Sequence, residues 1–207
     1  MQEFNEKLAS FIGIVLGDGY IYSKNGGHEI VISSHSEDDV QFLKDYVDPL
    51  AQYLFNKIPK YLIDKKAKNI KLRIQSKDAV DLIINSGLKP GNKILNNTTI
   101  PKWIFKNKDF LRNCIRGIID TDGSVFPKST NKNTPQIEVS SRIPKLREDF
   151  RKGLMILGFK PSNWSKGSNT PNCGLYAKDQ VFKYFNEITF NNPKHTKRFI
   201  NISNLNS

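Results

Sequence analysis

The chain has 207 residues, enough for one large domain or two small ones with a sizeable core. Its 32 lysines and arginines against 20 aspartates and glutamates give a net charge of +12, which favours a polyanionic partner such as nucleic acid. There is no apolar run of about 18 residues or more and no isolated basic amphipathic helix, which argues against a membrane partner. The acidic N-terminus does not match a secretion signal, and Cys114 and Cys173 have no partners at zinc spacing, so we expect an intracellular protein.

The first predicted element is an apolar helix over residues 5–17 that ends at an Asp-Gly corner. Its end reads FIGIVLGDG, in which Gly13 and Gly17 lie four residues apart and therefore on one face of the helix. Glycine inside a helix costs about 1 kcal/mol relative to alanine, so the pair indicates that a second backbone packs closely against this face. Asp18 follows at the C-terminal end, where the helix dipole disfavours a carboxylate. A bound cation would offset that effect, which makes Asp18 a candidate metal ligand.

After this corner the pattern predicts two hairpins, each followed by a helix. The expected elements are strands at 20–24 and 29–35, a helix that begins after a cap at Ser36, strands at 61–63 and 69–75, and a short helix at 77–86. In the alternating strands, isoleucine and leucine side chains would face one side and polar side chains the other. This order predicts a four-stranded sheet with one face covered by helices.

Residues 88–108 contain Pro90, Gly91 and Pro101 and are predicted to be a connector. The order of elements then starts again. The expected elements are a helix at 109–121, strands at 124–128 and 136–142, a helix at 144–157, poorly marked strands within 161–177, and a helix at 179–188. We therefore divide the chain into a first repeat (1–87), the connector (88–108), a second repeat (109–190) and a basic tail (191–207) that either follows phosphates or is solvated.

The motif at the end of the first helix occurs a second time, as IRGIIDTDG at 115–123. Gly13, Gly17 and Asp18 are matched there by Gly117, Thr121 and Asp122, 104 positions later (122 − 18). A buried helix followed by an Asp-Gly turn would explain one copy but not two matched copies. We expect the two helices to pack together through Gly13, Gly17, Gly117 and Thr121. Asp18 and Asp122 would then lie side by side, and two adjacent carboxylates are commonly stabilised by divalent metal ions.

On these two motifs the chain resembles the LAGLIDADG homing endonucleases, in their single-chain, two-repeat form. Leu16 departs from the acidic residue that is usual at its place in the motif, whereas Asp120 retains it. The resemblance implies an α+β fold, a pseudo-twofold duplicated αββαββα repeat whose two antiparallel sheets form a DNA-binding saddle. It further implies a monomer that hydrolyses one phosphodiester bond on each strand of a long, weakly palindromic site in double-stranded DNA.

The resemblance also implies the chemistry of the site. Asp18 and Asp122 would be catalytic and, with the backbone carbonyls of Gly17 and Thr121, would hold Mg²⁺, for which we expect Mn²⁺ to substitute. The ion would activate the attacking water and stabilise the leaving 3′ oxygen. A basic residue at the end of each return strand typically supports such a site. The matching triplets Ser-Ser-His and Ser-Ser-Arg give these places to His35 and Arg142, although lysine is the more familiar occupant.

The open faces of the two sheets are expected to read base edges in the major groove. The side chains that would do so are Tyr20, Tyr22, Lys24, Ser33, Lys71, Arg73, Gln75, Lys128, Gln136, Ser140 and Tyr176. A solvated sheet face would explain these polar residues equally well, but not why two such faces flank a pair of carboxylates.

Two other functions stay open on this fold. An RNA maturase that assists intron splicing would use the same basic saddle without requiring the metal site, and intron RNA would then be a partner. A non-catalytic DNA-binding regulator would have lost the catalytic aspartates, so the intact Asp18 and Asp122 argue against it. The pattern does not distinguish an intron from an intein origin.

Overall fold

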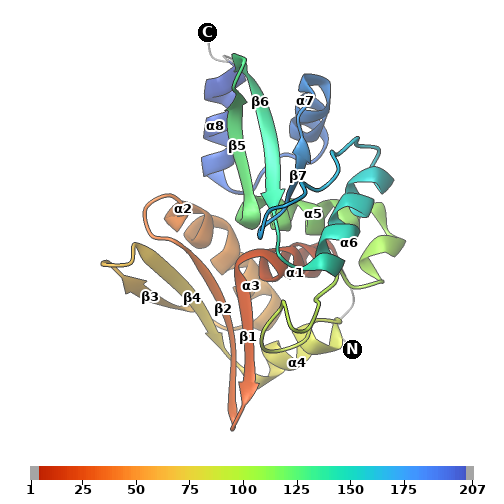
Figure 1. The fold of residues 1–207 in the computed structure, drawn as a ribbon. Coiled ribbons are helices and arrows are strands. Elements are labelled where there is room, and N and C mark those ends of the chain that lie inside the picture. Colours follow the sequence, from red (N-terminus) through yellow and green to blue (C-terminus); the bar gives the residue numbers. More distant parts are fainter. Residues whose placement is uncertain (1–4, 204–207) are drawn as a thin grey trace.

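Two helices lie at the centre of the molecule, each followed by an antiparallel sheet (Figure 1). The structure is a computed structural model that describes residues 5–203. The central helices are α1 (Glu6–Asp18) and α5 (Lys108–Asp122), the two helices predicted from the repeated motif. The architecture confirms the predicted α+β class, and the order of elements in the second half repeats that of the first except for one missing strand and the added helix α8.

The first sheet has four strands in the order β1-β2-β4-β3. Its strands are β1 (Gly19–Lys24), β2 (Gly27–His35), β3 (Lys60–Asp64) and β4 (Asn69–Gln75). Asn25 and Gly26 both have positive φ, 51° and 77°, the conformation that a two-residue hairpin turn requires. Between the hairpins, α2 (Val40–Phe42) continues through one π-helical turn (Leu43–Val47) into α3 (Asp48–Phe55), and α4 (Lys77–Asn85) follows β4.

The second sheet has three strands in the order β5-β6-β7 instead of the expected four. They are β5 (Gly123–Lys128), β6 (Asn131–Ser140) and β7 (Asn172–Leu175). A segment beside β7 makes only isolated backbone bonds to it, from Ser162 N to Gly174 O (2.9 Å) and from Ser165 N to Asn172 O (2.8 Å). This segment, residues 161–171, is rich in Ser, Asn and Pro and lacks the alternating apolar residues that would hold a full strand on the core.

Four more helical segments complete the second half. They are a short 3₁₀ turn (Ile104–Lys106), α6 (Pro144–Ile156), α7 (Lys178–Glu187) and α8 (Pro193–Ser203). The last of these replaces much of the expected basic tail. His195 and Phe199 are both fully buried, because one face of α8 packs on β5 and β6 (Figure 1). Within residues 5–203, none of the helices is long and apolar enough to cross a membrane.

The two central helices approach each other through their small residues. A methyl group added at Gly117 would lie 2.6 Å from the carbonyl oxygen of Ser10, and one added at Gly13 would overlap the carbonyl oxygen of Cys114. At the next turn, Gly17 faces the side chain of Thr121. Since both backbones come this close only without Cβ atoms, the repeated glycines set the spacing of α1 and α5, and with it the position of the residues at their ends.

Candidate active site

The last residues of the two central helices, Asp18 and Asp122, lie at the same end of the helix pair. Burial raises the pKa of Asp18 to about 6, and burial together with the charge of Asp18 raises the pKa of Asp122 to about 7. Ser34 Oγ donates a hydrogen bond of 3.4 Å to Asp18 Oδ2. The helix-packing residues therefore bring the two carboxylates close enough to interact through their charges.

Lys93, a residue of the connector, reaches into this pair. Its ammonium group donates to three carbonyl oxygens at the C-terminal end of α1, those of Val15 (3.3 Å), Leu16 (2.9 Å) and Gly17. Burial lowers the pKa of Lys93, whereas the charges of Asp122 and Asp18 raise it; the charge of Lys93 in turn lowers the pKa of both carboxyls. The Lys93 ammonium is thus a cation at the C-terminal end of α1, where the helix dipole and the two carboxylates stabilise a positive charge.

The loop that carries Lys93 is fixed by its own hydrogen bonds. Asn92 Oδ1 accepts from the backbone N–H groups of Ile94 and Leu95, and the backbone N–H of Gly91 donates to Ile21 O on β1 (2.9 Å). Sequence reasoning missed Lys93, because the connector carries no catalytic motif. The one available signal was local: Pro90-Gly91-Asn92 is a strong turn sequence directly before a lysine.

Arg142 shares a cavity of about 540 Å³ with Lys93 and Asp122. It lies two residues beyond the end of β6 rather than on the return strand, and it is exposed. Thr170, Ser140 and Ser141 line the same cavity. The cavity therefore has one carboxylate and two cations around a space large enough for a phosphate group.

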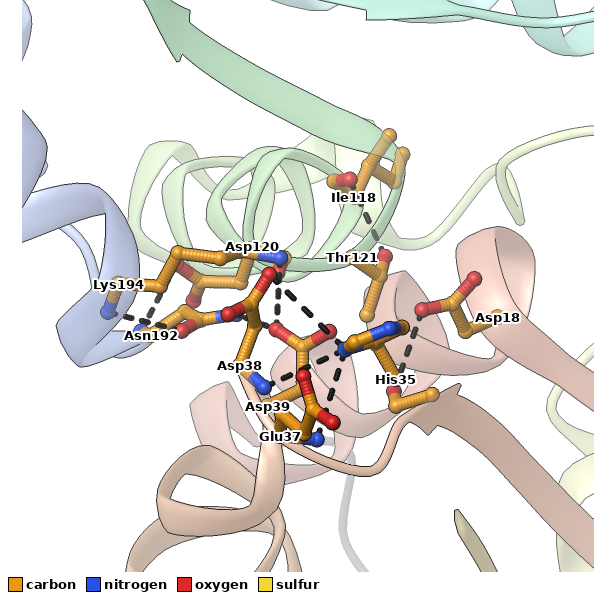
Figure 2. Close-up of polar contacts among 11 residues, drawn as sticks. Asp18, His35, Glu37, Asp38, Asp39, Ile118, Asp120, Thr121, Asn192 and Lys194 are labelled. Atoms are coloured by element: carbon orange, nitrogen blue, oxygen red, sulfur yellow. Dashed lines mark hydrogen bonds and ion pairs between the residues drawn. The ribbon is translucent and has the colours of Figure 1, made fainter. Parts of the chain in front are cut away.

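His35 is placed differently from Arg142. It is the last residue of β2, and its Nδ1 accepts from the backbone N–H groups of Glu37 and Asp38, both at 3.4 Å. In Figure 2 the dashed lines from His35 run to this turn and not to Asp18. These contacts support a turn-capping role for the imidazole, and the two predicted basic positions are therefore not equivalent.

The oxygen atoms at the ends of α1 and α5 fit a hard divalent cation. Two carboxylates provide oxygen donors, as does the carbonyl oxygen of Gly17, which in this structure accepts from the Lys93 ammonium. The charge repulsion felt by Asp122 is one that a bound cation would relieve. The hydroxyl of Thr121 is directed elsewhere, because it donates to Gly117 O (2.9 Å). Across the described residues, no three His, Cys, Asp or Glu side chains gather at one point, so an ion would need backbone, water or substrate oxygens as further ligands.

Asp120 occupies the place in the second motif that Leu16 occupies in the first, and its contacts indicate a structural role. It is buried, burial raises its pKa to about 7, and its carboxylate accepts from the backbone N–H groups of Asn191 and Asn192. Asn192 Nδ2 also donates to Asp39 Oδ1 (2.8 Å), and Lys194 pairs with the same atom at 2.7 Å (Figure 2). Asp120 and Asp39 thus anchor the start of α8 to both halves of the molecule. Leu16, at the matching place in α1, is buried.

Most of the predicted DNA-binding residues of the first half lie on the open face of the first sheet. Five of them line one groove of about 500 Å³, together with Glu29, Val31 and Leu62; they are Tyr20, Tyr22, Ser33, Lys71 and Arg73. Lys24 and Gln75 are exposed at one end of the same sheet. The groove combines aromatic walls with charged and polar side chains, as a surface that reads nucleic acid requires.

The predicted residues of the second half are more dispersed. Gln136 Nε2 donates to the carbonyl oxygen of Tyr176 (3.3 Å), and Tyr176 Oη donates to Glu138 (2.5 Å). Lys128 is exposed near the tip of the hairpin, whereas Ser140 lies in the cavity beside Asp122. The structure therefore brings Ser140 close to Asp122, whereas Lys128 and Gln136 lie on the second sheet and Tyr176 directly follows its strand β7.

Comparisons with known proteins agree with this architecture. Residues 109–202 match the family described as a LAGLIDADG-like domain. The replication factor C small subunit of Methanocaldococcus jannaschii is 28% identical over 149 residues, which cover 68% of this chain but only 8% of that much longer polypeptide.

Solved structures match nearly the whole chain. A crystal structure of I-DmoI in complex with DNA and Mn superposes with a TM-score of 0.63 at 20% identity, covering 89% of this chain and 96% of that one. The LAGLIDADG meganuclease I-AabMI bound to uncleaved DNA gives 0.63 at 14% identity, covering 98% and 91%. The N-terminal LAGLIDADG domain of DUF199/WhiA gives 0.61 at 14% identity, covering 88% and 80%. At these identities the likeness establishes a shared fold.

Proposed function

We propose that this chain, whose second half is a LAGLIDADG-like domain and whose fold is that of the single-chain LAGLIDADG homing endonucleases, is a site-specific double-strand DNA endonuclease that depends on a divalent metal ion. One observation carries the proposal. Asp18 and Asp122 interact at the foot of two glycine-packed helices, with Lys93 beside them, and the two sheets extend from this point. A structural helix pair would not need two buried carboxylates with raised pKa values.

In this proposal the oxygen atoms of Asp18, Asp122 and Gly17 would hold Mg²⁺, or Mn²⁺ in its place, with the Thr121 carbonyl as the matching donor. The ion supplies activation of water and stabilisation of the leaving oxygen when it is bound. Lys93 and Arg142 bind the scissile phosphate in the cavity that they share with Asp122. We assign the supporting basic role to Lys93 and Arg142, because the imidazole of His35 is engaged by its own turn.

The DNA would lie along the open faces of both sheets as a long duplex bound by a single chain. The net charge of +12 favours such a partner, and the relatives of the same fold include proteins in complex with DNA. A non-catalytic regulator on this fold is disfavoured by the intact carboxylate pair.

The relative named replication factor C small subunit bears on the genetic setting of the chain. Its matching segment makes up 8% of a much longer polypeptide. An endonuclease encoded within an intein is a short segment inside a longer host polypeptide, as this match is. We therefore favour an intein origin over an intron origin.

The test is incubation of the purified chain and Mg²⁺ with a plasmid that carries the rejoined insertion locus. We expect linear DNA with ends at one position, and none when EDTA replaces Mg²⁺. Asp18→Asn and Asp122→Asn serve as matched variants, because each removes one charge while keeping the size of the side chain. We expect either change to slow cleavage by orders of magnitude on at least one strand while DNA binding stays nearly intact. Parental cleavage rates in both variants would show that the site is wrong.

A further inference from the structure

Glu29 is an acidic residue on the face of the first sheet that, under the proposed function, meets DNA. It lies on β2 in the groove that Lys71 and Arg73 also line, and its side chain is 15% exposed. A carboxylate at such a place repels phosphate groups and would weaken binding of any duplex. Its position on this face therefore indicates a purpose other than attraction of the DNA backbone.

The partner of Glu29 is Arg73, on the adjacent strand β4. Arg73 Nε donates to Glu29 Oε1 at 2.6 Å, and the terminal NH2 group donates to Oε2 at 3.0 Å, which makes the pair bidentate. The strand register explains why they meet. Val31 lies opposite Arg73 and Glu29 lies opposite Gln75, so Glu29 and Arg73 are diagonal neighbours on one face of the sheet.

The geometry of this pair determines which donors of the arginine stay available. A guanidinium group has five N–H donors in a fixed plane. Glu29 engages the Nε side of the group, which leaves the outer fork of the two terminal nitrogens for another acceptor. That fork matches the O6 and N7 acceptors that guanine presents in the major groove. A phosphate group is the weaker match, because Glu29 neutralises the positive charge of the Arg73 guanidinium that would attract a phosphate.

The surroundings of the pair are apolar on several sides. Tyr20, Tyr22, Val31 and Leu62 line the same groove of about 500 Å³. These walls limit how the Arg73 side chain can move once Glu29 holds it. Lys71, two residues before Arg73 on β4, is exposed and points to the same face of the sheet without such a carboxylate clamp.

We propose that Glu29 and Arg73 form a guanine-reading unit: Arg73 contacts one guanine of the target in the major groove, and Glu29 is the positioning residue that fixes its guanidinium. This proposal rests on the proposed function, because it requires that the first sheet binds DNA. It adds that the target contains a guanine at one position. Recognition of this guanine depends on Glu29, although the charge of Glu29 repels the DNA backbone.

The test compares base preferences rather than cleavage. The chain and its variants are mixed with a DNA library in which every position of the target is randomised, in Ca²⁺, and the bound sequences are counted. For the parent we expect guanine at one position to be preferred by about 5- to 150-fold. Arg73→Met should remove that preference, because methionine has no N–H donor for the O6 and N7 acceptors of guanine. Glu29→Gln should reduce it at the same position, while affinity for the other sequences stays equal or rises because a repelling charge is lost.

Lys71→Ala is the matched control from the same strand and face. It should weaken binding of all sequences alike and lower the salt slope of binding by about 1. Glu29→Asp, which keeps the charge but shortens the side chain, is a second variant if Glu29→Gln folds poorly, and it should also reduce the guanine preference. Unchanged base preferences in folded Glu29 variants, or an equal loss on all sequences, would overturn the inference. A parent that selects no sequence at all would overturn the proposed function itself.

Discussion

Lys93 is the residue whose importance depends most on the fold. Its ammonium donates to the C-terminal carbonyls of α1, and its charge lowers the pKa of both Asp18 and Asp122. Removing it would leave two acidic groups with less compensation, and would remove one of the two cations around the cavity. The residue therefore acts on the charge of the site and on the binding of a phosphate at the same time.

We expect Lys93→Met to slow single-turnover DNA cleavage by about 10²- to 10³-fold, the range seen when one electrostatic contact to a reacting group is lost. Binding of the uncut duplex should change by less than tenfold, roughly, because one phosphate contact among 6–10 is lost. Lys89→Met is the matched control, since Lys89 belongs to the same connector and is exposed. Equal cleavage rates for the two variants would remove Lys93 from the site.

His195 gives the stability of the protein a dependence on pH. It is fully buried, and burial lowers its pKa to about 4 from a usual value of about 6.5. The folded state thus keeps His195 neutral where the unfolded chain protonates it. The resulting stabilisation is present above about pH 6.5 and is lost as the pH falls towards 4.

For His195→Phe we expect a smaller loss of unfolding free energy between pH 7 and pH 4.5 than in the parent, by on the order of 2 kcal/mol. Asp120, whose pKa is raised to about 7, has the opposite dependence, because between about pH 4 and 7 the unfolded chain ionises this carboxyl while the folded state keeps it protonated, so stability falls as the pH rises. It is present in both proteins, so the difference between them isolates His195. Urea unfolding at the two pH values measures this, and parallel pH profiles would contradict it.

At the scale of elements, the contact of α1 with α5 depends on Gly117 and Gly13. A Cβ at Gly117 would meet backbone atoms, Ser10 O at 2.6 Å and Ile14 N at 2.9 Å, and neither can move without displacing a helix. Gly153 in α6 offers a comparison, because a Cβ there would meet the end of the Ile115 side chain at 3.0 Å. A Cβ at Gly117 would therefore collide with main-chain atoms, whereas a Cβ at Gly153 would meet a side chain that can change its rotamer.

We expect Gly117→Ala to destabilise the protein by about 3 kcal/mol or more, as overpacking against a rigid partner does. Gly153→Ala should change stability by less than about 1 kcal/mol, because its mild crowding is offset by the better helix propensity of alanine. Thermal unfolding of both variants is the measurement. If Gly117→Ala were as stable as Gly153→Ala, the close packing of the central helices would not be what positions Asp18 and Asp122.

The elements that could be predicted from the sequence are those with a strong local signal. The helix ends at Asp18 and Asp122 follow from the motif, and the hairpin at Asn25-Gly26 from its turn residues. The π-helical turn between α2 and α3 has no such signal. Residues 193–203 read as a basic tail because of their lysines and arginine, although His195 and Phe199 are spaced four apart on one helix face and Pro193 suits a helix start.

The candidate site was predictable only in part, for a physical reason. Asp18 and Asp122 carry a repeated pattern, but Lys93 reaches them from a loop whose course depends on bonds such as that from Gly91 N to Ile21 O. His35 and Arg142 hold equal places in the alignment of the strands. The turn that follows each strand differs, however, so that one side chain is engaged locally and the other lines the cavity.

At the scale of the whole molecule, the net charge of +12 must act mainly on phosphates if the proposed function holds. With roughly 6–10 phosphate contacts, affinity for the target should fall by about 10³- to 10⁵-fold between roughly 50 and 200 mM salt. Fluorescence anisotropy with a labelled duplex measures this, and sedimentation of the free chain should give a monomer, since both motifs lie in one molecule. A flat salt response would mean that the basic surface does not bind DNA.

The anchoring of α8 by Asp39 has a consequence for the order in which the chain folds. Asn192 and Asp39 are 153 residues apart in the chain, and Lys194 joins the same carboxylate. During synthesis, the first repeat leaves the ribosome long before these partners exist. Contacts of such long sequence separation form slowly, so the docking of α8 should be a late step of folding. Asp39 and Asp120 then gain their donors together, which makes the two repeats parts of one cooperative folding unit rather than two domains that mature in turn.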